Sequence, residues 1–264
     1  MKIKFTHVTQ IAALSLVVLF GTMLSVAQKP VTKQEKAAIE NIVREYLLKN
    51  PKVLREAMQA LEQQEAQDRR EAVARDLKSL KTDIYDDVTS PVGGDPNGDV
   101  TVVVFFDYNC GYCKTTLPDL EGMLKKDPKL RVIYKEFPIL SNDSQLAAQA
   151  AMAAAKQGKY IEFHRALLST DSATEASIRS VSDRLKLDYA KLKADMKDPK
   201  LNEALLRNRS IASKLGINGT PGYIVGDQII PGAIDAVSLA NLVASERSKS
   251  SGAKPQKTAA MINK

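Results

Sequence analysis

A short apolar run that leads straight into two cysteines is the feature that most constrains the fold of this chain. Residues 100–106 are apolar and rich in β-branched side chains, the pattern of a strand covered on both faces. Cys110 and Cys113 follow, and apolar residues then recur at helical spacing over residues 117–124. We therefore expect a buried strand, a short loop and a helix whose first turn holds the second cysteine.

The two cysteines are the only ones in the 264 residues, so they cannot form the disulfide framework of a small secreted module. The thiolate is the attacking species in disulfide exchange, and the free N–H groups and dipole at a helix N-terminus stabilise it. We expect Cys110 to be an exposed nucleophile, helped by Lys114. We expect Cys113 to be the resolving thiol that releases a mixed disulfide.

The same spacing is compatible with half of a zinc site or with a structural disulfide. The only histidines are His7 and His164, which do not easily complete a set of four ligands. A disulfide across two residues closes too small a loop to stabilise the fold much. The redox interpretation is favoured, with no metal and no other cofactor.

Residues 1–27 predict a cleaved signal peptide, with a basic start at Lys2 and Lys4, an apolar stretch over residues 11–26 and a small residue, Ala27, at the cleavage point. The alternative is an uncleaved membrane anchor. The apolar stretch falls short of the roughly 20 residues that span a bilayer. We therefore expect a periplasmic location.

The formal net charge of +7 does not predict nucleic-acid binding. Basic residues alternate with acidic ones along helices, as in residues 67–71, where a nucleic-acid interface would cluster them with aromatic side chains. We expect a solvated helical surface and no nucleic-acid partner. Residues 249–264 are polar and are expected to form a disordered tail.

Residues 28–87 predict a helical oligomerisation arm. From Val31 to Asp87 there is no glycine, helix-forming residues dominate, and Asn50-Pro51 breaks the apolar stripe. A later stripe has the spacing of a coiled-coil seam and comprises Val73, Leu77, Leu80 and Ile84. Amphipathic helices more commonly pack on a neighbouring domain, but the polar middle of this segment favours self-association.

The rest of the chain predicts an α/β domain with a helical insertion. Turn formers over residues 90–98 mark a boundary, and a strand is expected at residues 130–135. We expect the first part of the domain at residues 88–141, inserted helices at 142–215, and the second part, with two short strands and a final helix, at 216–248.

Three further residues are weaker site candidates. Glu136 follows a strand and could tune the cysteines by proton exchange from beneath them, although a surface carboxylate is the more ordinary interpretation. His164 is expected to be a helix-surface residue or one whose hydrogen bonds are partly satisfied, and the alternative is a catalytic base. Pro221, after Thr220, has the position of an ordinary turn proline.

Three segments together resemble the DsbA-like thiol-disulfide oxidoreductases: residues 105–114, residues 135–140 and Gly219-Thr220-Pro221. The resemblance implies a thioredoxin fold interrupted by a helical domain, acting on protein thiols and disulfides. It also implies a cis Pro221 facing the cysteines, with Thr220 pairing with the substrate backbone. Gly111 and Tyr112 are expected to modulate the pair, and they lack the histidine that favours a strong oxidant in the best-known member.

Residues 37–54 resemble the multimerisation region of the ScsC-like (suppressor of copper sensitivity) branch of that family. This implies a homodimer or homotrimer joined through residues 31–87, with disulfide isomerase activity and a membrane redox partner that recharges the cysteines. The alternatives are a monomeric DsbA-type thiol oxidase and a copper-tolerance protein that binds metal through the same thiols. A scaffold whose arm matters more than its thiols has little support.

Overall fold

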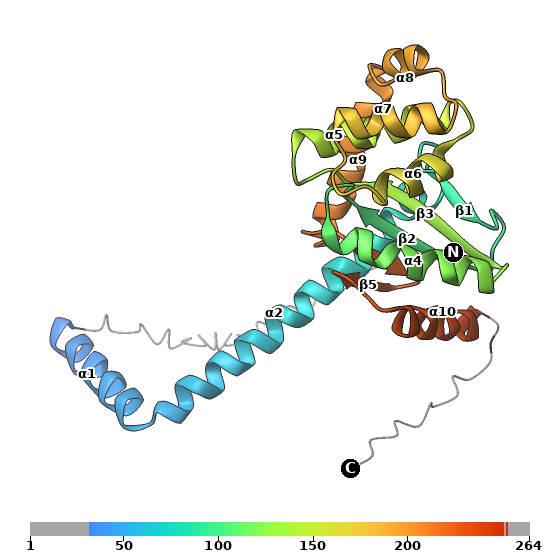
Figure 1. Cartoon of the computed structure of the whole chain (residues 1–264). Helices are drawn as coiled ribbons and strands as arrows, with labels where there is room; N and C mark the ends of the chain where they lie inside the picture. Colours follow the sequence, from blue (N-terminus) through green and yellow to red (C-terminus); the bar gives the residue numbers. More distant parts are fainter. Residues whose placement is uncertain (1–31, 251, 253–264) are drawn as a thin grey trace, which may run out of the picture. The chain divides into compact units, whose positions relative to one another are not determined.

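The computed structural model describes residues 32–250 and residue 252 (Figure 1). The predicted signal peptide at residues 1–27 and most of the predicted tail lie outside the described residues. The chain forms two compact units, one up to Glu62 and one from Gln63 onward. Within the described part, no helix is long and apolar enough to cross a membrane.

The first unit consists of helix α1 (Lys33–Lys49) and the first part of helix α2 (Pro51–Ser79). A capping box between Thr32 and Glu35 starts α1. Asn50 ends it, because the backbone N–H and the side chain of Asn50 both donate to the carbonyl of Tyr46. The helix break predicted at Asn50-Pro51 is therefore confirmed.

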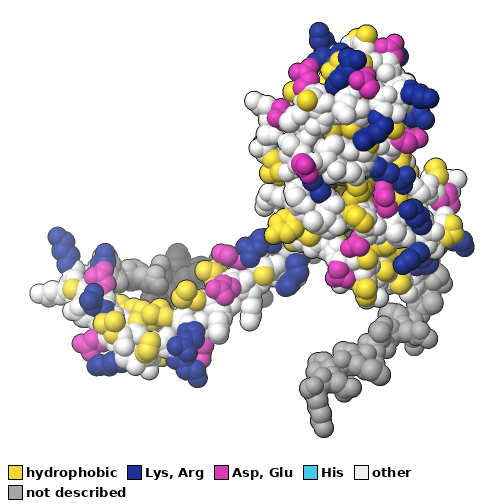
Figure 2. Space-filling view, in the orientation of Figure 1, with side chains coloured by type: hydrophobic (Ala, Val, Ile, Leu, Met, Phe, Trp, Pro, Cys, Tyr) yellow, Lys and Arg dark blue, Asp and Glu magenta, His cyan; other side chains and the backbone are white. Residues whose placement is uncertain are grey.

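The apolar stripe of α1 lies on the surface of the chain and consists of Ile39, Ile42, Val43 and Tyr46. Neither α1 nor α2 has a buried residue, and hydrophobic side chains gather over α1 and the first turns of α2 (Figure 2). Ile42 is 68% exposed and Tyr46 is 55% exposed. Monomeric soluble proteins seldom leave a contiguous apolar surface of this kind in water.

The second unit is built on a five-stranded sheet in the order β1-β3-β2-β4-β5. β2 and β3 run parallel, and the other neighbouring pairs are antiparallel. The strands are β1 (Val92–Gly94), β2 (Val100–Phe106), β3 (Leu130–Glu136), β4 (Gly222–Val225) and β5 (Gln228–Pro231). Helices α4 (Gly111–Lys126) and α10 (Ala236–Ser250) pack on one face of this sheet. The predicted α/β thioredoxin-like fold is confirmed.

β1 was not predicted, because its three residues lie in the glycine-rich stretch that predicts turns. Gly94 has φ +75°, and a Cβ there would lie 2.2 Å from the carbonyl oxygen of Leu130. Only glycine fits this close approach of the strand to β3. At the other end of the domain, α10 continues to Ser250, past the predicted start of the tail at Lys249.

The insertion predicted at residues 142–215 is a group of five helices beside the sheet (Figure 1). Alanine side chains of the first helix are almost fully buried, which lets its neighbours approach closely. The helices are α5 (Asn142–Ala155), α6 (Tyr160–Leu168), α7 (Glu175–Arg184), α8 (Tyr189–Asp195) and α9 (Pro199–Lys214).

The apolar stripe over residues 73–84 does not form the expected coiled-coil seam. Leu80 and Ile84 are buried in a cluster with Val103 and Phe105 of β2, and Leu77 packs against the same cluster. Ile84 belongs to the short helix α3 (Lys81–Tyr85). The stripe therefore joins the core of the domain, as amphipathic helices commonly do.

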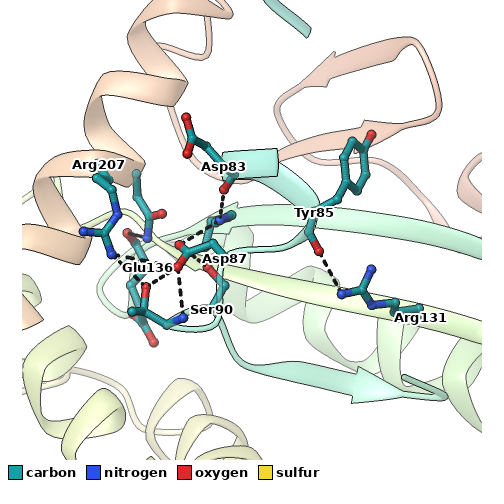
Figure 3. Close-up of polar contacts among 10 residues, drawn as sticks. Asp83, Tyr85, Asp87, Ser90, Arg131, Glu136 and Arg207 are labelled. Atoms are coloured by element: carbon teal, nitrogen blue, oxygen red, sulfur yellow. Dashed lines mark hydrogen bonds and ion pairs between the residues drawn. The ribbon is translucent and has the colours of Figure 1, made fainter. Parts of the chain in front are cut away.

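A buried ion pair holds the segment after α3 against the sheet. The Lys135 side chain is fully buried, and its Nζ donates to the carbonyl of Asp83 at 2.8 Å and to Asp87 Oδ2 at 3.2 Å. Figure 3 shows Asp87 together with Asp83, Ser90 and Arg207. Burial raises the pKa of the Asp87 carboxyl, but hydrogen bonds from Thr89 and Ser90 and the charge of Lys135 outweigh it and lower the pKa to about 2.

Replacing Asp87 by asparagine is expected to lower the free energy of unfolding by about 2 kcal/mol at pH 7, allowing for the partial exposure of Asp87. The cause is the buried Lys135 ammonium, which loses its counter-charge. Because the folded pKa is depressed, the contribution of Asp87 is present above its unfolded pKa of 3.8 and is lost as the pH falls through about 2. Urea unfolding between pH 2 and pH 7 measures it.

The exposed neighbour Asp86 supplies the control, because Asp86→Asn removes the same charge from an exposed site. Adding Lys135→Met to Asp87→Asn is expected to restore most of the stability, since it removes the unpaired charge. An Asp87→Asn variant as stable as the wild type at pH 7 would contradict this assignment.

Candidate active site

The two cysteines lie at the start of α4, as predicted. Cys110 is the N-cap residue of the helix, and its Sγ accepts a hydrogen bond from the backbone N–H of Cys113 at 3.4 Å. Cys113 lies in the first helical turn, and both cysteines are free thiols. The positive end of the helix dipole and a free N–H group therefore face the Cys110 sulfur.

The fold brings the distant Thr220-Pro221 peptide to these cysteines. β4 follows Pro221 directly and pairs with β2, the strand that leads into the redox loop. The Thr220-Pro221 bond is cis, as the family resemblance implies. Cys110 Sγ donates to the Thr220 carbonyl at 3.1 Å, so the carbonyl and the sulfur are in direct contact.

The expectation of an exposed Cys110 is wrong for this structure, in which Cys110 is 6% exposed and Cys113 is 4% exposed. The contact with Thr220 covers Cys110. Burial raises the pKa of Cys113, so this thiol is held protonated. Lys114 donates to the carbonyls of Thr170 and Asp171, at 2.9 and 2.7 Å, so its ammonium is engaged by the inserted domain.

Gly111 and Tyr112, the residues between the cysteines, face the surface. Tyr112 is 69% exposed, and a Cβ at Gly111 would meet nothing within 4 Å. This edge of the motif is therefore open to an approaching polypeptide.

Asp107 holds the loop between β2 and α4, residues 107–110, in place. This residue was not identified from the sequence. It is 1% exposed, and its side chain accepts hydrogen bonds from the backbone N–H groups of Asn109, Ile139 and Leu140 at 2.8, 2.9 and 3.0 Å. Its own carbonyl accepts from the Cys110 N–H at 3.1 Å. An aspartate directly after a fully apolar strand was the available signal for this role.

Glu136 is buried, so its interpretation as a surface carboxylate is wrong. It is 1% exposed, and its Oε1 accepts hydrogen bonds from the hydroxyls of Tyr108 at 3.0 Å and Tyr160 at 2.7 Å. Burial raises the pKa of Glu136 to about 8, although both hydrogen bonds act in the opposite direction. The backbone alternation of β3 places Glu136 and Lys135 on opposite faces of the sheet.

His164 is also buried rather than on a helix surface. It is 2% exposed, and its ring lies 4.6 Å from the Phe106 ring and 4.7 Å from the Tyr134 ring, measured between centroids. Its Nδ1 lies 3.1 Å from the Tyr108 hydroxyl. Burial lowers the pKa of His164 to about 3, which keeps the imidazole neutral.

Two family models match this chain. The model of the DSBA-like thioredoxin domain matches residues 101–244, and the model of the copper resistance protein ScsC N-terminal domain matches residues 35–68. The first match contains Cys110, Cys113, Glu136, Thr220 and Pro221. The second contains the exposed apolar stripe of α1.

Several solved structures are similar to this chain. A thioredoxin-like oxidoreductase from Silicibacter pomeroyi is 39% identical, with a TM-score of 0.62, over 63% of this chain and 97% of that one. The thiol-disulfide exchange protein alpha-DsbA2 from Wolbachia pipientis is 31% identical, with a TM-score of 0.62, over 67% and 97%. Proteus mirabilis ScsC in a transitional conformation is 31% identical, with a TM-score of 0.62, over 83% and 97%.

The first curated relatives are much longer proteins. The Na(+)/H(+) antiporter NhaA 3 of Salinispora tropica is 29% identical over 154 residues, and this chain spans 24% of its length. The Na(+)/H(+) antiporter NhaA 1 of Salinispora arenicola is matched over the same share of its length, at 27% identity.

Proposed function

The chain belongs to the family of DSBA-like thioredoxin domains, and on that premise we propose that it exchanges disulfides with protein substrates through Cys110 and Cys113. The observation that carries this proposal is the Cys110 sulfur at the N-terminus of α4. It lies 3.4 Å from the Cys113 backbone nitrogen and 3.1 Å from the Thr220 carbonyl oxygen. Helix N-termini stabilise thiolates, which are the attacking species in exchange.

The reaction has two steps, and each step breaks one disulfide bond and forms another. The Cys110 thiolate attacks a substrate disulfide, forms a mixed disulfide and releases one substrate sulfur as a thiolate. The Cys113 sulfur then attacks Cys110 Sγ, forms the Cys110–Cys113 disulfide and releases the second substrate sulfur. Oxidation of a substrate dithiol is the same sequence in reverse.

Thr220 and Pro221 are proposed to hold the substrate backbone beside the reacting sulfurs. The contact between Cys110 Sγ and the Thr220 carbonyl supports this role, because a peptide that reaches the sulfur must also pass Thr220. Gly111 and Tyr112 are proposed to modulate the pair from its open edge.

Self-association through the first unit is proposed as the basis of isomerase activity. Its support is the exposed apolar stripe on α1 and the match to the ScsC N-terminal domain over residues 35–68. The stripe consists of Ile39, Ile42, Val43 and Tyr46. A dimer or trimer would bury these side chains and bring several redox sites into one particle.

The copper-tolerance alternative rests on the description of the second family match. Metal retained stoichiometrically by the reduced protein, without exchange activity, would favour it. For the redox protein, the signal-like composition of residues 1–27 supports a periplasmic location. A membrane protein that recharges the cysteines is proposed as its partner.

Catalysed reduction of insulin disulfides by the full chain, set against the same chain with Cys110 replaced, tests the proposed function. Reactivation of a substrate with scrambled disulfides tests the isomerase direction.

A further inference from the structure

A row of hydrogen-bonded side chains runs through the core behind the redox pair. Glu136 on β3 accepts from the Tyr108 hydroxyl at 3.0 Å, and the same hydroxyl lies 3.1 Å from His164 Nδ1 on α6. All three side chains are 2% exposed or less. The exchange steps described above assign no role to Glu136, Tyr108 or His164.

The direction of these hydrogen bonds follows from their proton count. Tyr108 has a single hydroxyl proton, which it donates to Glu136 Oε1. The contact with His164 is then donated by an Nδ1–H group. Because burial lowers the pKa of His164 to about 3, the ring is neutral and its Nε2 carries a free lone pair.

A small cavity connects this row to the resolving thiol. It measures about 20 Å³, which is room for one water molecule. Cys113 and His164 both line it, with Pro221 and apolar side chains of β2 and α4. Its other polar wall residues are Thr116, Tyr134 and Tyr223, so a water in the cavity has hydrogen-bonding partners.

The Glu136 carboxyl is suited to hold a proton at the far end of the row. Its Oε2 is buried and has no hydrogen-bond partner among the described residues. A neutral, protonated carboxyl is favoured over an ion in such a place. The titratable or charged groups packed around the row are Asp107, Cys113, Glu121, Tyr134, Tyr160 and Arg165.

We propose that His164, Tyr108 and Glu136 form a buried relay that removes the proton of the Cys113 thiol when Cys113 attacks the mixed disulfide. This proposal rests on the proposed function. Cys113 gives its proton to the cavity water, which passes one to His164 Nε2. His164 passes its Nδ1 proton to Tyr108, and Tyr108 passes its hydroxyl proton to Glu136 Oε1. The new bond joins Cys113 to Cys110, and the substrate sulfur leaves with the electron pair of the broken bond.

The relay would provide a proton acceptor for a buried thiol. Burial raises the pKa of Cys113, so the resolving thiol carries its proton at neutral pH. A thiol is a poor nucleophile. Cys113 is 4% exposed, so solvent has little access to it, whereas the cavity that Cys113 lines is also lined by His164.

The experiment separates the two sulfur attacks in one reaction of the reduced full chain with the aromatic disulfide 5,5′-dithiobis(2-nitrobenzoate). Attack by Cys110 releases one coloured thiolate at a rate that depends on reagent concentration. Attack by Cys113 releases the second at a rate that does not. Stopped-flow absorbance from pH 5 to pH 10 measures both phases in the wild type and in Glu136→Gln, Tyr108→Phe and Tyr160→Phe.

In the wild type, the rate of the second phase is expected to rise with pH and to reach a plateau near pH 8, where Glu136 becomes ionised and able to accept a proton. Glu136→Gln and Tyr108→Phe are expected to slow the second phase about 100-fold at pH 8 and to abolish the plateau in its pH profile. Tyr160→Phe is the matched control, because it removes the hydroxyl that donates to the same Oε1 and keeps the aromatic ring that stacks on His164. The rate in this variant is expected to keep its plateau but to reach it at higher pH, because the hydrogen bond that is lost lowers the pKa of Glu136 in the wild type.

A second phase with wild-type rate and wild-type pH profile in Tyr108→Phe and Glu136→Gln would overturn the relay. If Tyr160→Phe loses the plateau in its pH profile to the same extent as Tyr108→Phe, the relay is also overturned, because the network would then act only through packing. An absent first phase in the wild type would instead contradict the proposed function, so the two failures are distinguishable.

Discussion

The Cys110→Ser variant is expected to reduce insulin disulfides no faster than the uncatalysed reaction. A serine hydroxyl forms no disulfide, so neither exchange step can begin. Serine is a favoured N-cap residue, and its oxygen can accept the Cys113 N–H that now bonds to the Cys110 sulfur. The variant should therefore keep its fold, and its loss of activity reports on chemistry. Insulin turbidity with dithiothreitol as the reductant measures it.

The control for this variant lies on the same helix. Thr115 is exposed and begins the turn after the motif, so Thr115→Ala changes α4 without touching either sulfur. It is expected to keep wild-type activity. Catalysed insulin reduction that survives in Cys110→Ser would contradict the assignment of the nucleophile.

The second large effect is expected on assembly. Ile42→Lys places a charge in the middle of the exposed stripe of α1, where Ile42 is 68% exposed in the single chain. If the stripe is an interface, the substitution removes about 1.5–3 kcal/mol of apolar burial per subunit and adds the cost of burying an ammonium. The oligomer is expected to dissociate to monomers, with loss of isomerase activity and retention of insulin reduction.

Val237 supplies a matched control for assembly. It lies on α10 in the second unit and is 70% exposed, so Val237→Lys makes the same chemical change on a surface outside the stripe. Light scattering should give the wild-type mass for Val237→Lys and the monomer mass for Ile42→Lys. A wild-type protein that is already monomeric would contradict the oligomer proposal.

The elements around the redox pair were predictable because their signals are local. The apolar residues of β2 precede the cysteines directly, and the residues after Cys113 repeat at helical spacing. The break at Asn50-Pro51 is equally local, because proline cannot continue a helix that precedes it. In each case a few consecutive residues determine the structure.

The buried polar residues were not predictable, because their environment comes from distant parts of the chain. Glutamate and histidine are residue types that usually lie at the surface. Glu136 and His164 are buried here because α6 of the insertion packs against the sheet. Tyr160 on the same helix donates a hydrogen bond to Glu136. Likewise, the Val73–Ile84 stripe has coiled-coil spacing, and only the tertiary structure shows that its last two residues enter the sheet core.

The position of Thr220 beside Cys110 was accessible only through the family resemblance. The two residues lie 110 positions apart in the sequence, separated by all five inserted helices. Nothing in the composition of a turn that contains proline indicates which strand it will lie against.

Trapping of the mixed disulfide tests the central claim most directly. In Cys113→Ser, Cys110 can attack a substrate disulfide but nothing can resolve the product. Intact-protein mass spectrometry after incubation with insulin is expected to show insulin bound covalently to the variant through Cys110, and dithiothreitol should release it. A Cys113→Ser protein that retains only its own mass would contradict the account, because Cys110 would then not be a nucleophile toward protein disulfides.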